Sequence, residues 1–188
     1  MHVSELDRYR AQFEAIGDRA KELAAGLDET RFNWRPAPDR WSIEECLGHL
    51  ILVGQREVHA LEEAIQRGKE RGAADSRPFS HGPFSYGPIE RFILGQTEPP
   101  VRNPRNAPRR FHPLHGQPVT AVLPTFLHLE SQFILQAEAA RGLDLRRVKV
   151  STPFSRFLRM SLGMMFAQAA AHQRRHLEQA TRVFHQLP

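Results

Sequence analysis

The chain has 188 residues, 40% hydrophobic and 25% charged, a composition typical of one soluble globular domain, which we expect to span residues 1–188. Its net charge of +5 comes from 26 basic and 21 acidic residues that are interspersed without a nucleic-acid-binding motif, so we expect no nucleic-acid partner. The chain has no apolar run long enough to span a membrane. Cys46 is its one cysteine, so an intrachain disulfide is excluded. Because the sequence also lacks the apolar core of a signal peptide, we expect a cytoplasmic protein.

A first helix is predicted from Ser4, with Asp7 placed three residues later as in a capping pair, to about Gly26. Its apolar residues recur at spacings of three and four, which is typical of a helix that buries one face in a bundle: Leu6, Tyr9, Phe13, Ile16, Ala20, Leu23 and Leu27. Residues 28–41 form a proline-rich connector, and we expect Trp34 and Trp41 to pack it onto the core.

A second helix is predicted to begin at Ser42, because Glu45 three residues later completes a capping box. Its buried face comprises Ile43, Cys46, Leu47, Leu50, Val53, Leu61 and Ile65. His49 lies at the flank of this face and is a candidate metal ligand. Cys46 lies one turn from His49 and is interpreted as a small buried packing residue, although a redox or ligand role stays open.

Residues 68–117 form a long irregular segment, since nine of the 14 prolines fall between residues 78 and 118. One short helix is predicted near residues 89–94. Segments of this length in a compact domain are usually functional or disordered. Four side chains could line a pocket or simply be solvated: His81, Tyr86, His112 and His115.

A third helix is predicted from Val119 to Arg141, ended by Gly142, with Pro124 near its start. Residues 143–160 connect to a fourth helix, capped by Ser161, and no strand pattern is evident. The fold class is therefore all-α. We expect an up-down four-helix bundle with the long irregular segment between its second and third helices, crossing over one end.

The fourth helix contains the sequence AAAHQRRHLEQ, which sets His172 and His176 four residues apart. On a helix these imidazoles share one face, about 5–6 Å apart at Cβ, and can bind one metal ion. Buried histidines that are only hydrogen-bonded into the core are the alternative. Gln173 stands where a zincin protease has its glutamate, which argues against that class. A third ligand from His49 requires the second and fourth helices to be neighbours.

Two segments, NWRPAPDRWSIEECLGHL (33–50) and AAHQRRHLEQ (170–179), resemble the DinB-like (YfiT-like) superfamily of metal-binding four-helix-bundle proteins, which includes bacillithiol transferases and mycothiol-dependent enzymes. The resemblance covers nearly the whole chain. It implies that His49, His172 and His176 bind a divalent metal ion, nickel or zinc in the first place, with manganese or iron as further options. It also implies a homodimer. The segment 68–117 is longer than in compact members, which leaves the substrate open.

The leading functional hypothesis is a metal-dependent enzyme, a thiol-dependent S-transferase that joins a low-molecular-weight thiol to a small-molecule electrophile. Arg56 or Arg175 could bind carboxylates of these molecules, or remain solvated. A hydrolase using a metal-bound water, with Glu45 as acid or base, is the first alternative. A non-catalytic, stress-related metal- or ligand-binding protein is the second. Three side chains lie one turn from the ligands and could bond ring nitrogens: Glu45, Gln168 and Gln179.

Overall fold

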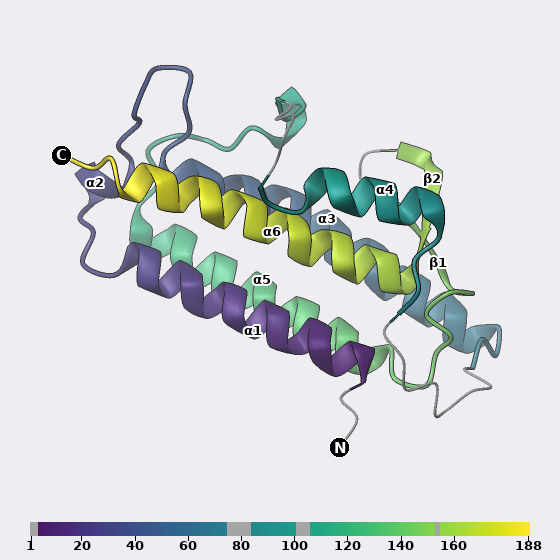
Figure 1. The fold of residues 1–188 in the computed structure, drawn as a ribbon. Coiled ribbons are helices and arrows are strands. Elements are labelled where there is room, and N and C mark those ends of the chain that lie inside the picture. Colours follow the sequence, from purple (N-terminus) through teal and green to yellow (C-terminus); the bar gives the residue numbers. More distant parts are fainter. Residues whose placement is uncertain (1–3, 75–83, 101–105, 153–154) are drawn as a thin grey trace.

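The computed structural model describes residues 4–74, 84–100, 106–152 and 155–188. Its long helices are α1 (Glu5–Ala24), α3 (Ile43–Glu70), α5 (Val119–Ala139) and α6 (Leu162–Phe184) (Figure 1). The shorter elements are α2 (Glu29–Phe32), α4 (Pro88–Thr97), the 3-10 helix η1 (Arg109–Phe111), and strands β1 (Lys149–Thr152) and β2 (Ser155–Ser161). The chain is thus mostly helical, as predicted. Among the described residues, no helix combines the length and the apolar character needed to cross a membrane.

The predicted capping residues begin three of the long helices. Ser4 at α1 and Ser42 at α3 each form a capping box, with Asp7 and Glu45 respectively. Ser161 accepts a hydrogen bond from a backbone N–H in the first turn of α6. These side chains satisfy N–H groups that have no partner inside the helix, which is why the helices begin where they do.

Each long helix packs against two others: α1 and α3 both contact α5 and α6 (Figure 1). Stacked rings fill the interface of α1 with α5, where the centroids of Phe13 and Phe133 are 4.7 Å apart. Another stacked pair, Tyr9 and Phe166, joins α1 to α6 at 5.5 Å. Burial of these aromatic side chains supplies much of the hydrophobic stabilisation of the core.

The helix directions correct one expectation. In α3 and α5 the residue pairs that approach each other advance together, so these two helices run parallel: Gly54 lies beside Leu129, and Gly68 lies beside Leu143, four residues beyond the end of α5. A strictly alternating up-down order would make them antiparallel. They are parallel because the described parts of the intervening segment, α4 and residues 106–118, lie along the length of the molecule and lead back to the end where α3 begins (Figure 1).

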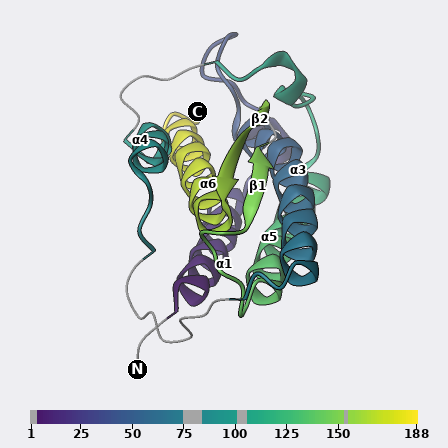
Figure 2. The same ribbon diagram turned by 90° about the vertical axis from the view of Figure 1, so that its right-hand side faces the viewer.

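A small sheet is the second correction, because no strand was expected in residues 143–160. Strands β1 and β2 lie side by side and pair antiparallel (Figure 2). The pairing places Val150 opposite Met160, and both side chains are buried. The sheet has only two short strands, of four and seven residues. Such short strands carry too few alternating positions to be recognised from sequence.

The described part of the segment between α3 and α5 lies against the long helices. Helix α4, which confirms the short helix predicted near residues 89–94, packs along α6 (Figure 2). Gln168 of α6 donates to Thr97 at 2.8 Å, and Arg174 binds the carboxylate of Glu98 at 2.6 and 2.8 Å. His81, one of the candidate pocket residues, lies outside the described residues.

The core also contains polar side chains from three helices. Glu57 of α3, Glu130 of α5 and Gln173 of α6 are 1–3% exposed. Neither carboxylate oxygen of Glu130 and neither amide atom of Gln173 has a hydrogen-bond partner among the described residues. Burial raises the pKa of Glu57 to about 8, and burial together with the charge of Glu57 raises the pKa of Glu130 well above its usual range.

Candidate metal centre

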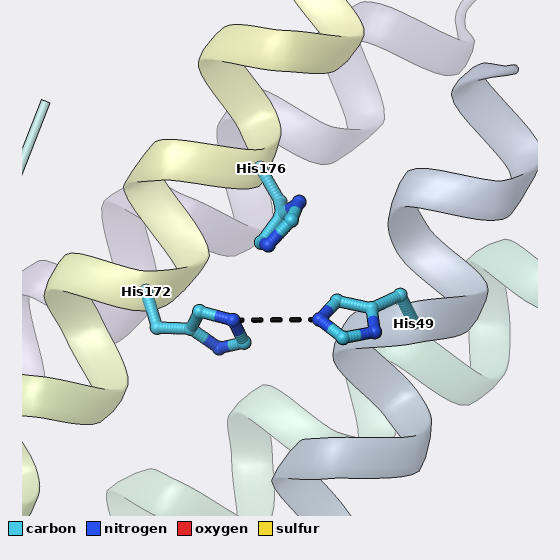
Figure 3. A group of neighbouring side chains, drawn as sticks. All are labelled: His49, His172 and His176. Carbon is cyan, nitrogen blue, oxygen red and sulfur yellow. Dashed lines mark hydrogen bonds between the residues drawn. The ribbon is translucent and has the colours of Figure 1, made fainter. Parts of the chain in front are cut away.

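The three histidines proposed from the sequence lie together (Figure 3). Helix α3 carries His49, and the antiparallel neighbour α6 carries His172 and His176, so packing of the two helices joins residues 123 positions apart. One ring nitrogen from each residue lies within 4.8 Å of the other two. Within the described part of the chain this is the one cluster of three or more histidine, cysteine or acidic side chains with such spacing.

Hydrogen bonds on the outer side of two rings fix their orientation. The Nδ1–H of His49 donates to the carbonyl oxygen of Phe111 at 2.8 Å, and the Nδ1–H of His176 donates to Gln179 Oε1 at 3.1 Å. Because both acceptors are oxygens, the proton sits on Nδ1 and the Nε2 lone pair stays free. The Nε2 atoms of His49 and His172 are 3.4 Å apart and face each other (Figure 3).

Electrostatics keeps all three imidazoles neutral. Burial lowers the pKa of His49, lowers that of His172 to about 3, and lowers that of His176 well below its usual range. The positive charge of Arg175 lowers each of these pKa values further. Neutral imidazole is the form that binds metal ions, so the group has its donor atoms ready at neutral pH.

Trp41 lies against the histidine group. Its ring centroid is 4.9 Å from that of His49 and 5.7 Å from that of His176. Trp41 immediately precedes the Ser42 cap, so the same turn that starts α3 positions the indole. The expectation that Trp41 packs the connector onto the core is therefore incomplete, because the indole also borders the site.

Residues 106–117 supply the carbonyl that orients His49. A Cβ atom on Gly48 would lie 2.9 Å from Pro113 Cβ, so the absence of a side chain lets this segment approach α3 closely. The approach places Phe111, which is fully buried, with its carbonyl on His49. Sequence reasoning missed this acceptor, because a backbone carbonyl has no residue signature.

The side chains predicted to lie near the proposed ligands make different contacts. Gln179 bonds a ring nitrogen, as expected, whereas Gln168 bonds Thr97 on α4. The carboxylate of Glu45 accepts hydrogen bonds from Arg35 at 2.5 and 2.7 Å and from the Ser42 N–H. It therefore caps the first turn of α3 and does not bond any of the three histidine rings of the site. Cys46 is fully buried, its pKa is raised by that burial, and it is not part of the histidine group.

The other candidate pocket residues are dispersed. His112 stands edge-on to Trp41 with ring centroids 5.9 Å apart, His115 lies 3.5 Å from the carboxylate of Glu45, and Tyr86 bonds the hydroxyl of Tyr9. Arg56 lies over the ring of Phe111 at 4.8 Å. Only His112 reaches the border of the histidine group, through Trp41.

These residues define a class of protein: a mostly helical protein in which three neutral imidazoles, two buried and one half-buried, lie close enough together to hold a metal ion. The family model of the DinB superfamily matches residues 12–180, and the chain belongs to this superfamily. The family resemblance drawn from residues 33–50 and 170–179 is thereby confirmed. The search of the curated proteins and the search of the solved structures each gave no match.

Proposed function

We propose that His49, His172 and His176 bind a divalent metal ion and that the chain is a thiol-dependent S-transferase acting on small electrophiles. The observation that carries the proposal is a converging set of neutral nitrogen donors that, among the described residues, includes no cysteine and no carboxylate. We further infer that the four long helices form a DinB-like four-helix bundle, since each packs against two others.

The donor set favours nickel or zinc, because imidazole nitrogens suit these ions and three protein ligands are typical of catalytic rather than structural zinc. When bound, the metal would act as a Lewis acid that favours the thiolate form of a coordinated thiol. The Phe111 carbonyl and Gln179 hold the rings of His49 and His176 in the donor orientation.

The nucleophile has to arrive with a cosubstrate. The thiol of Cys46 is buried with a raised pKa, which keeps it protonated and inaccessible. A thiol R–SH and an electrophile R′–X would give R–S–R′ and HX, with the sulfur–carbon bond formed as the bond to X breaks and the thiol proton released to solvent. The hydrolase alternative loses support, because Arg35 and the Ser42 N–H engage Glu45, its candidate acid or base.

Metal content tests the first half of this proposal. Inductively coupled plasma mass spectrometry on untagged protein should find near-stoichiometric nickel or zinc in wild type and almost none in His49→Ala or His172→Ala. Lys69→Ala, an exposed position on the same helix as His49, is the control and should retain the metal. Stoichiometric metal in His172→Ala would disprove the assignment, as would metal-free wild type after reconstitution with both ions.

Turnover tests the second half. A panel of thiols is incubated with 1-chloro-2,4-dinitrobenzene, and thioether formation is followed by absorbance in wild type and His172→Ala. We expect thiol-dependent consumption that the variant loses. Ester or amide cleavage without thiol would instead identify a hydrolase, and neither activity would identify a binding protein.

A further inference from the structure

Arg175 has a special position in α6. It lies between the two histidines of this helix, three residues after His172 and one before His176. It is half-buried, and its charge acts on the imidazoles of both helices, including His49 of α3. Arg175 therefore lies beside the histidine group.

Arg175 also differs from comparable arginines. Within the described residues, the other half-buried arginines each have a carboxylate partner: Arg35 with Glu45, Arg67 with Glu63, and Arg174 with Glu98. No hydrogen bond or ion pair is found for Arg175 among those residues. Glu178, the acid one turn further along α6, is bound to Arg182 at 2.6 Å. A partly buried guanidinium without a counter-ion is costly, which suggests a partner from outside the chain.

The charge of the site leads to the same conclusion. Three neutral imidazoles add no negative charge to a divalent ion, and Arg175 adds one positive charge. Glu45, the acid one turn before His49, does not offset this charge because it forms an ion pair with Arg35. A loaded site would therefore carry about three uncompensated positive charges, which favours anionic ligands over neutral ones.

We propose that Arg175 is the anion-binding residue of this site and that the thiol cosubstrate is a mercaptocarboxylate, whose carboxylate Arg175 binds while its sulfur takes an open coordination position. The inference rests on the proposed function and names its substrate class. A guanidinium suits the task because it binds a carboxylate through two parallel N–H groups.

A matched pair of thiols tests the inference without measuring activity. Protein reconstituted with Co²⁺ is titrated with 3-mercaptopropionate and with the neutral 3-mercaptopropionamide, following the sulfur-to-cobalt charge-transfer band. Wild type should bind the carboxylate at least about tenfold more tightly than the amide. Arg175→Gln should lose this preference while its affinity for the amide stays unchanged.

Two further variants make the result specific. Arg175→Lys keeps the charge but not the paired N–H groups, and should retain part of the preference. Arg91→Gln removes an exposed arginine from α4 and should retain all of it. Equal preference for the carboxylate in wild type and Arg175→Gln would overturn the inference.

Failure of the proposed function gives a different result. If neither thiol produces a charge-transfer band, the thiol hypothesis fails, and succinate then tests Arg175 alone. Succinate should raise the melting temperature of the cobalt protein in wild type but not in Arg175→Gln. No rise in either protein would overturn the anion-binding role as well.

Discussion

At the scale of single residues, Trp41 combines a structural position with a place at the site. It precedes the capping Ser42 and packs against the rings of His49 and His176. Its indole supplies apolar surface that shields one side of the histidine group. The proposed metal ligands are other residues, so packing and metal binding can be separated by substitution.

We predict that Trp41→Ala lowers the free energy of unfolding by about 2–4 kcal/mol, because it leaves a cavity between the connector and α3. The variant should still bind stoichiometric metal when the ion is saturating. Thermal unfolding and metal analysis measure the two effects, with Trp41→Phe as the conservative control. Unchanged melting of Trp41→Ala would contradict the packing role.

The residue pattern predicted the grouping of the three histidines better than the hydrogen-bond acceptors around them. Spacing of four placed His172 and His176 on one face, and the phase of the second helix placed His49 at the edge of the core. The amide of Gln179 was also foreseeable, because it lies one turn from His176. The Phe111 carbonyl was not, since its contact depends on how residues 106–117 lie against α3.

At the scale of elements, the contact of residues 106–117 with α3 depends on a missing side chain. Gly48 leaves room for Pro113, and the segment that contains Pro113 also carries the carbonyl that orients His49. A change in this contact should therefore alter the orientation of His49, one of the proposed metal ligands.

We predict that Gly48→Ala weakens metal binding about tenfold or more, because the added methyl group displaces Pro113 and with it the Phe111 carbonyl. Competition with a chelator of known affinity measures the change. Gly95→Ala is the matched control, since that glycine of α4 has open space around it. Equal affinity of the two variants would refute this dependence.

Local signals account for the helix ends but not for the helix directions. Ser4, Ser42 and Ser161 cap their helices as expected, because capping depends on residues within one turn. The parallel arrangement of α3 and α5 depends on the path of the segment between them. The prolines of that segment predict irregular structure but not its path. The β1–β2 pair was missed because two short strands leave little periodicity to detect.

At the scale of the whole molecule, the buried pair Glu57 and Glu130 links stability to pH. The pKa of Glu57 is about 8 in the folded protein and near 4.5 when the chain is unfolded. Between these values the folded state holds a proton that the unfolded state has lost. The pair's contribution therefore makes stability fall as the pH rises from about 4.5 to about 8.

We predict that Glu57→Gln removes the part of this decline that Glu57 contributes, because a neutral amide of the same shape has no proton to lose, while the buried Glu130 keeps its own part. At pH 9 the variant should be more stable than wild type by roughly 2–5 kcal/mol. Denaturant unfolding from pH 5 to pH 9 measures the difference. Glu62→Gln, an exposed change on the same helix, should keep the wild-type slope, and a wild-type slope in Glu57→Gln would contradict the prediction.

The separation of His49 and His172 by 123 positions has a kinetic consequence. A site made from segments so distant in the chain forms only after α3 and α6 have docked, so metal capture should be among the last steps of refolding. An ion bound at the proposed site would act as a removable cross-link that closes a long loop of the chain. Chelation should then accelerate unfolding, much as reduction does in a protein held by a disulfide.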